Sequence, residues 1–285
     1  MKVMYLLFKQ LRPKQWTKNL IVFAAPLYSM QLSYPGVFLK SLICFFLFCF
    51  VSGCVYILND FIDRESDRQH PEKMLRPMAS GALNPYWALT FGFFLLVASI
   101  WVATLFHVLY ALCLIIYFTV NVFYSLLLKH VVIIDILLVS SGFVLRAVGG
   151  ALVINVPMTG WFLLCTLWLS LFLTVSKRRH ELYLLQNKKG AHRKVLNYYS
   201  IALLDQYNGI FATCTILSYS LFAFNSAHAE LVMWSIPFVL YGICRYLYLI
   251  QQEGKGGKPE QILLEDKHIL VTVVMYVVLM IVILY

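Results

Sequence analysis

The sequence predicts an all-α protein that crosses a membrane many times. Its 285 residues are 61% hydrophobic and only 13% charged, with a mean hydropathy of +0.78. A water-soluble domain of this length could not bury so much apolar surface. The apolar residues gather in runs of about 20, the length that an α-helix needs to cross the hydrocarbon core of a bilayer. These runs show no sustained alternation of apolar and polar residues, which argues against a transmembrane β-barrel.

The elements follow from the order of these runs. Residues 1–13 are basic and amphipathic, which predicts a helix lying in the membrane interface and stopped by Pro13. The runs that follow predict about nine membrane-spanning helices, near residues 20–35, 37–58, 86–106, 108–128, 131–153, 160–176, 208–225, 231–250 and 268–285. The longest polar connection, residues 177–207, is too short to fold alone. We therefore predict a single integral-membrane domain over residues 1–285.

The basic residues predict how the chain is oriented. There are 23 Lys and Arg against 13 Asp and Glu, a formal charge of +10. Nearly all of these cations precede the first predicted span or follow the second, fourth, sixth and eighth, whereas residues 154–159 and 226–230 contain none. By the positive-inside rule, the N-terminus and the basic connections lie in the cytoplasm, and the C-terminus lies outside the cell membrane. This one-sided charge suits anionic lipids and phosphorylated substrates, and we expect no nucleic-acid partner.

The second predicted span ends in an acidic stretch, "NDFIDRESD". In a continuous helix, the carboxylates of Asp60, Asp63 and Asp67 share one face. Such a row repels itself unless a cation fills it, and Mg²⁺ is suited to this because it binds one or two carboxylates and bridges to phosphates. The alternative is a solvated helix end at which the aspartates pair with Arg64 and Arg68.

Several segments resemble one known family. "NDFIDRESD" resembles the NDxxDxxxD motif of the UbiA superfamily of intramembrane prenyltransferases, and "RPMASG" resembles the segment that follows that motif. The segments "LRPKQWTKNLIVFAAPL", "YSLLLKH", "DILLVSSGFVLRAVGG" and "SKRRHEL" are similar to its decaprenyl-phosphate phosphoribosyltransferase branch. The resemblance covers about residues 10–185. It implies a nine-helix bundle with its active site on the cytoplasmic side, where Asp60, Asp63 and Asp67 hold Mg²⁺.

A second motif separates the branches of that superfamily. Members that use prenyl diphosphates carry a second aspartate-rich motif at the position where this chain has "SKRRHE", residues 176–181, and only Glu181 is acidic here. Phosphoribosyl diphosphate carries a diphosphate and a separate 5-phosphate, so binding it requires more positive charge. Lys177 and Arg178 are therefore predicted to bind its phosphates. The alternative for them is an ordinary basic end of a span.

Further polar residues complete the predicted site. Arg146 lies in an apolar run, where a charge is costly; we predict that it lines a cavity, and snorkelling or an internal pair are the alternatives. Tyr124 and Lys129 close the fourth predicted span, where an aromatic-belt helix end explains them equally well. The predicted catalytic residues are Asp60, Asp63, Asp67, Lys177 and Glu181. The predicted substrate-binding residues are Lys14, Lys18, Asn59, Arg76, Tyr124, Lys129, Arg146 and Arg178.

The resemblance implies a Mg²⁺-dependent transfer of a 5-phosphoribosyl group from phosphoribosyl diphosphate (PRPP) to a polyprenyl phosphate. Pyrophosphate would be released, and the product would be a lipid-linked sugar precursor for cell-envelope polysaccharide. The leading alternative is a UbiA-type prenyl transfer from a prenyl diphosphate to an aromatic or other acceptor. A transporter is disfavoured because the chain has no convincing internal repeat, and a scaffold leaves the acidic stretch unexplained. The expected partners are PRPP, polyprenyl phosphate and the bilayer, and a homo-oligomer is compatible with the sequence.

Overall fold

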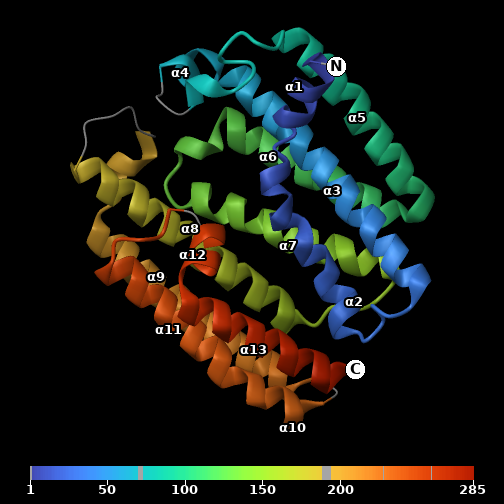
Figure 1. The fold of residues 1–285 in the computed structure, drawn as a ribbon, viewed down its shortest axis with the longest axis vertical. Coiled ribbons are helices and arrows are strands. Elements are labelled where there is room, and N and C mark those ends of the chain that lie inside the picture. Colours follow the sequence, from blue (N-terminus) through green and yellow to red (C-terminus); the bar gives the residue numbers. More distant parts are fainter. Residues whose placement is uncertain (1, 70–72, 188–193, 227, 258) are drawn as a thin grey trace. The chain divides into compact units, whose positions relative to one another are not determined.

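Helices make up the regular structure of the chain in the computed structural model. It describes residues 2–69, 73–187, 194–226, 228–257 and 259–285, and no strand occurs within these ranges. In chain order the elements are α1 (Lys2–Gln10), η1 (Pro13–Phe23), α2 (Ala24–Tyr28), α3 (Pro35–Ile62), α4 (Arg64–Arg68), η2 (Lys73–Leu75), α5 (Pro85–Phe106), α6 (Val108–Leu126), η3 (Leu128–His130), α7 (Ile134–Ile154), α8 (Gly160–Asn187), η4 (Lys194–Tyr198), α9 (Ile201–Phe224), α10 (Ala229–Val232), η5 (Met233–Ser235), α11 (Ile236–Gln252), α12 (Pro259–Glu265) and α13 (Lys267–Leu284). Figure 1 shows their course. Eight helical segments of the described chain are long and apolar enough to cross a membrane, which confirms the predicted polytopic all-α architecture.

The chain divides into two compact units. Unit 1 comprises residues 1–129 and 142–157, and unit 2 comprises residues 130–141 and 158–285. The division falls within α7, which contributes its first residues to unit 2 and the remainder to unit 1. The single domain predicted for the whole chain stays a prediction.

The first predicted span, near residues 20–35, is not a long α-helix. The chain instead forms the 3₁₀ helix η1 and the short α2, which run antiparallel to α3 within unit 1 (Figure 1). Two contacts fix this alignment. Asn19 Nδ2 donates to Cys49 Sγ at 3.1 Å, and the rings of Phe23 and Phe45 lie 5.8 Å apart.

The segment formed by η1 and α2 is long for its number of residues. A 3₁₀ helix rises about 2.0 Å per residue and an α-helix about 1.5 Å. The eleven residues of η1 and five of α2 therefore extend roughly 30 Å, the thickness of the hydrocarbon core. A close approach to α7 holds the segment, because a Cβ on Gly150 would lie only 2.2 Å from the carbonyl oxygen of Val22.

Helix α1 precedes this segment and has two different sides. Leu7 and Leu11 are buried in an apolar cluster with the end of α3 and the chain that follows η2. Val3, Met4 and Phe8 are more than half exposed. An exposed apolar side next to a basic sequence suits a helix at a membrane surface, and this location stays a prediction.

Helix α5 shows most clearly that unit 1 belongs in lipid. It carries the exposed side chains Phe93, Phe94 and Trp101, each more than 60% accessible, and only 17% of its apolar window is buried. So large an apolar surface is unfavourable in water and favourable against acyl chains.

In unit 2, two helices extend further than the sequence predicts. Helix α8 continues to Asn187, eleven residues past the predicted end of its span, and α9 begins at Ile201. Ser200 starts α9 by accepting a hydrogen bond from the backbone N–H of Leu203. The polar connection predicted for residues 177–207 is therefore shorter, and residues 188–193 lie outside the described part. Lys, Arg, Glu and Leu all favour the helical conformation. The helix therefore continues past the end of the apolar run.

Candidate active site

The acidic stretch "NDFIDRESD" forms the end of α3 and the start of α4. Helix α3 ends at Ile62, and Asp63 joins the two helices with φ −86° and ψ 5°. Asp60 and Asp67 are each 2% exposed, whereas Asp63 is half-buried. The stretch is thus not one regular helix, and its carboxylates have different partners.

Arg76 joins two of the three aspartates. Its Nη1 donates to Oδ1 of Asp60 at 2.9 Å and to Oδ2 of Asp67 at 2.6 Å. Lys73 Nζ lies 3.9 Å from Asp67. Arg76 opens the segment "RPMASG", so the turn that follows η2 folds back onto the acidic stretch and supplies its counter-charge.

The third aspartate is paired separately. Lys129 Nζ donates to Oδ1 of Asp63 at 2.7 Å. This bond joins η3, the short helix after α6, to the acidic stretch. Arg64 and Arg68 bind Glu65 at 3.0 and 2.9 Å. The pairing of the aspartates with these two arginines, considered from the sequence, is therefore not the one that the structure has.

The aspartates of the predicted metal site lie on either side of the break at Asp63. Within the described ranges, no three acidic, His or Cys side chains gather closely enough to hold a metal ion. The metal-binding role of Asp60, Asp63 and Asp67 stays a prediction. Asp60 and Asp67 nevertheless fit Mg²⁺, a hard ion that takes one or two carboxylates and completes its shell with water and phosphate oxygens. The single Arg76 nitrogen between them shows that this point already stabilises positive charge.

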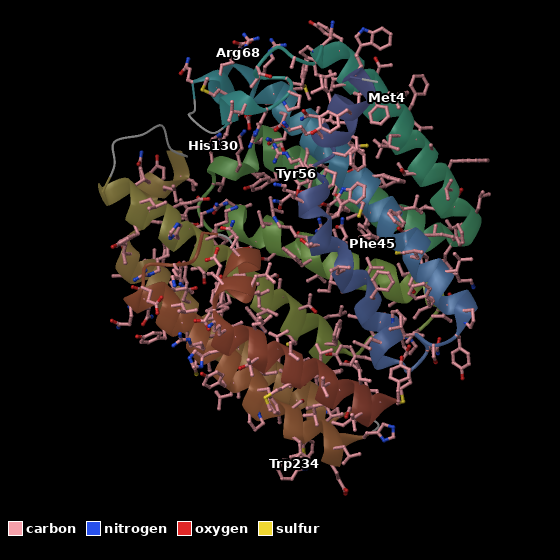
Figure 2. The ribbon with its side chains drawn as sticks, in the orientation of Figure 1. Met4, Phe45, Tyr56, Arg68, His130 and Trp234 are labelled. Atoms are coloured by element: carbon pink, nitrogen blue, oxygen red, sulfur yellow. The ribbon has the colours of Figure 1, made fainter. Side chains whose placement is uncertain are left out.

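Two residues next to Asp60 were missed by the sequence reasoning. Gln10 Nε2 donates to Asp60 Oδ2 at 2.5 Å, and Arg12 Nη2 donates to Asp60 Oδ1. The Arg12 guanidinium also lies 4.7 Å from the ring centre of Tyr56, which Figure 2 labels on α3. The sequence feature that could have indicated these two residues is the basic segment around Pro13, which was interpreted only as part of an interfacial helix.

A cavity of about 270 Å³ lies beside these groups in unit 1. Its lining residues are Lys9, Gln10, Arg12, Asp60, Leu75, Arg76 and Pro77. Three cations and one carboxylate therefore face one small space, which suits an anionic ligand.

Four other predicted residues lie elsewhere in unit 1. Lys14 is exposed and Lys18 half-buried on η1; Asn59 and Tyr124 are half-buried near the ends of α3 and α6. The lining of the cavity does not include them, and their roles stay predictions.

Arg146 is buried, at 6% exposed, among groups of unit 1. Its Nε donates to Asn19 Oδ1 at 2.5 Å, its Nη1 to the Gly142 carbonyl at 2.7 Å and its Nη2 to the Tyr117 hydroxyl at 2.7 Å. The Tyr117 ring also stacks on the guanidinium at 4.7 Å. This is an internal arrangement, one of the alternatives weighed above, and it fastens η1 to α6 and α7. A substrate role for Arg146 stays a prediction.

In unit 2, the predicted site residues Lys177, Arg178 and Glu181 lie on α8. Arg178 is 3% exposed, and it donates to Oδ2 of Asp135 and Oε2 of Glu181, both at 3.0 Å. The Tyr199 hydroxyl donates to the other Asp135 oxygen at 2.8 Å. Burial raises the pKa of Tyr199, and the hydrogen bond to Asp135 raises it further, so this phenol is a hydrogen-bond donor at neutral pH. Lys177 is exposed.

The next two residues of α8 hold unit 2 together. Arg179 Nε donates to Asp205 at 2.5 Å and its Nη1 donates to the Ile250 carbonyl at 2.8 Å. His180 Nδ1 lies 2.7 Å from the Gly254 carbonyl oxygen. Sequence reasoning assigned no such role to them, because their partners are far away along the chain.

The fold and the site together define a class. This is a polytopic helical membrane protein with a buried carboxylate pair, balanced by arginines, where one span ends. The sequence matches the UbiA prenyltransferase family over residues 20–261, and the chain belongs to that family.

Relatives and solved structures agree with this membership. A decaprenyl-phosphate phosphoribosyltransferase of Mycolicibacterium smegmatis is 35% identical over 277 residues, which cover 92% of this chain and 86% of the relative. One from Corynebacterium glutamicum is 35% identical over 271 residues, with 92% and 81% covered. A UbiA homologue from Archaeoglobus fulgidus, solved with GPP and Mg²⁺, superposes with a TM-score of 0.75 at 16% identity, covering 98% of this chain and 99% of that one. The predicted fold is confirmed, and a structural homologue with this fold binds Mg²⁺.

Proposed function

We propose that this protein transfers a 5-phosphoribosyl group from PRPP to a polyprenyl phosphate of the decaprenyl type and releases pyrophosphate. One observation carries the choice of substrates. Relatives named decaprenyl-phosphate phosphoribosyltransferase are 35% identical to this chain over 92% of its length. The product would be a lipid-linked sugar precursor for cell-envelope polysaccharide, made at the cytoplasmic face of the cell membrane.

The reaction needs little acid–base chemistry. An anionic oxygen of the acceptor phosphate attacks C1 of the ribose, the bond from C1 to the diphosphate oxygen breaks, and the diphosphate leaves with the electron pair. Because the attacking oxygen is already deprotonated, no general base is required. The work of the protein is to hold acceptor and C1 in line and to stabilise the leaving diphosphate.

Asp60 and Asp67 would hold Mg²⁺ in this reaction, joined by Asp63 if it leaves Lys129. When bound, the ion supplies positive charge to the diphosphate. Arg12 and Arg76 already touch the Asp60 carboxylate. They would orient that carboxylate and add positive charge to the donor site.

The other predicted site residues would bind the donor and the acceptor. In unit 2, Lys177 and Arg178 would bind phosphate and Glu181 the ribose. In unit 1, Asn59 would orient the donor. The candidates for either phosphate are Lys14, Lys18, Tyr124, Lys129 and Arg146.

Prenyl transfer is the second candidate. The observation in its favour is membership of a family named for prenyl transfer, with a fold also seen in a protein solved with GPP. Against it stands the basic sequence of residues 176–181, in which Lys177, Arg178 and Arg179 stand where prenyl-diphosphate-using members carry a second aspartate-rich motif. A single diphosphate would need fewer cations.

The test is a transfer assay with purified protein, PRPP labelled in the ribose, polyprenyl phosphate and Mg²⁺. The proposal expects label to enter the lipid extract, to be lost when EDTA removes the metal, and to return when Mg²⁺ is added in excess. A wild-type protein that is folded and loaded with metal but leaves the extract unlabelled would contradict the proposal.

A further inference from the structure

The cavity beside Asp60 contains more hydrogen-bond donors than the protein uses. Among the described residues, the Arg12 guanidinium bonds through Nη2, to Asp60, and the Arg76 guanidinium bonds through Nη1, to Asp60 and Asp67. In the described part of the chain, Nε and the other terminal nitrogen of each guanidinium have no hydrogen-bond partner. Lys9, which lines the same cavity, is exposed and likewise makes no ion pair with a described residue.

The charges of the lining residues indicate the ligand. Lys9, Arg12 and Arg76 contribute three positive charges and Asp60 one negative charge, which leaves a net charge of +2. A phosphate monoester carries close to −2 at neutral pH. Guanidinium groups bind such oxygens through charge-assisted hydrogen bonds.

The backbone holds Arg12 in place at a cost. Arg12 has φ 52° and ψ 63°, the left-handed conformation, which residues other than glycine adopt rarely. Strain of this kind persists where the surroundings hold it, and it clusters at ligand sites. This turn directs Arg12, the second residue after α1, towards Asp60 and the cavity.

Gln10 indicates which phosphate monoester fits. Its side chain is 1% exposed, and its Oε1 is buried without a hydrogen-bond partner among the described residues. Because a carboxylate can only accept hydrogen bonds, the amide nitrogen must face Asp60, and the oxygen is left to accept from another donor. A sugar phosphate has hydroxyl donors near its phosphate, whereas a polyprenyl phosphate has only a hydrocarbon chain.

We propose that Lys9, Arg12 and Arg76 form a subsite for a phosphate monoester, namely the 5-phosphate of the phosphoribosyl donor. Arg12 is its main phosphate-binding residue, and Gln10 accepts a hydrogen bond from a ribose hydroxyl. The inference rests on the proposed function, and it makes the N-terminal segment part of the donor site.

The test separates the two phosphates. Calorimetry measures binding of ribose 5-phosphate to purified protein without Mg²⁺, and steady-state kinetics measure KM for PRPP and for polyprenyl phosphate. The variants are Arg12→Gln, which keeps a donor for Asp60, and Lys9→Gln. Lys40→Gln is the matched control, because Lys40 is exposed at the opposite end of α3. Thermal unfolding in detergent shows whether each variant is folded.

Loss of a charge-assisted hydrogen bond should weaken ribose 5-phosphate binding by Arg12→Gln, and raise its KM for PRPP, by roughly 10- to 150-fold. Lys9→Gln should have a smaller effect in the same direction, and Lys40→Gln none. A rise in KM for polyprenyl phosphate alone would assign the subsite to the acceptor and overturn the donor assignment. Equal rises for both substrates, or no change, would overturn the subsite itself.

Ribose 5-phosphate binding also keeps this inference distinct from the proposed function. If wild type binds ribose 5-phosphate through Arg12 but does not use PRPP, the proposed function fails and the phosphate subsite stands. If wild type uses PRPP but Arg12→Gln binds ribose 5-phosphate as tightly as wild type does, the proposed function stands and the subsite fails.

Discussion

At Asp60, three side chains from two distant segments meet one carboxylate. Gln10 and Arg12 approach it from the chain end of α1, and Arg76 approaches it from the turn after η2. A buried carboxylate is stable only when such partners offset its lost hydration. Under the proposed function, the same negative charge that orders these residues would also hold the metal ion.

The first prediction compares acidic residues of one stretch. Asp60→Asn and Asp67→Asn should each lower kcat by roughly 100-fold or more, because a carboxamide binds Mg²⁺ far more weakly than a carboxylate. Glu65→Gln is the matched control. Glu65 is exposed and, in the described part of the chain, pairs with Arg64 and Arg68 alone, so this variant should stay near wild-type activity. Transfer assays over a range of Mg²⁺ concentrations measure the effect. Full activity of folded Asp60→Asn would remove the metal role from this residue.

The second prediction separates two neighbours on α8. Lys177→Ala should raise KM for PRPP by roughly 10- to 150-fold. Since Lys177 is exposed, the free energy of unfolding should change by no more than about 1 kcal/mol. Arg178→Ala should also destabilise the protein, by about 3–5 kcal/mol, because it leaves the buried Asp135 carboxylate without its cation. Thermal unfolding and both KM values are measured, with Lys255→Ala as the control. If KM for PRPP and for the acceptor rose equally, Lys177 would act only through the general field of the membrane face.

At the scale of elements, the N-terminal segment differs most from expectation. The sequence of residues 20–35 is apolar enough for an α-helix, and nothing in its periodicity distinguishes that from the 3₁₀ helix that forms. The choice depends on contacts with α3, α6 and α7 that are remote in sequence, above all those of Asn19 with Arg146 and of Val22 with Gly150. Helix packing at this level is a tertiary property.

The third prediction tests that packing. Gly150→Ala should destabilise the protein by about 1–3 kcal/mol or more, because the new Cβ would meet the Val22 carbonyl oxygen at 2.2 Å. Gly209→Ala in α9 is the matched control. A Cβ at Gly209 meets nothing within 4 Å, so the better helix propensity of Ala should stabilise by up to about 1 kcal/mol. Equal unfolding temperatures for the two variants would contradict the close contact between η1 and α7.

At the scale of the whole molecule, composition alone was enough to predict a polytopic helical protein, because a bilayer leaves few alternatives for so apolar a chain. The motif "NDFIDRESD" located the acidic site, since charges at the end of an apolar run are conspicuous. The sequence could not show that Asp63 pairs with Lys129 while Asp60 and Asp67 both pair with Arg76. That outcome depends on a break of one residue between α3 and α4, and helix ends are poorly specified by local pattern.

The fourth prediction concerns orientation in the membrane. In a background without cysteine, Ser66→Cys should be labelled only by a reagent that crosses the membrane, because its surroundings are rich in Arg and Lys. Thr159→Cys, in a connection without basic residues, should be labelled by an impermeant reagent on intact cells. Both positions are exposed on the described protein. The reverse pattern would place the acidic site outside the cell and exclude a cytoplasmic donor.

The most direct measurement of the central claim is a competition between donors. Purified protein receives PRPP and a prenyl diphosphate together, with polyprenyl phosphate, an aromatic acceptor and Mg²⁺, and mass spectrometry identifies the lipid products. The account predicts polyprenyl phosphate enlarged by one phosphoribosyl group, with one pyrophosphate released for each product formed. A prenylated aromatic product, with PRPP left unconsumed, would contradict phosphoribosyl transfer and leave only membership of the family.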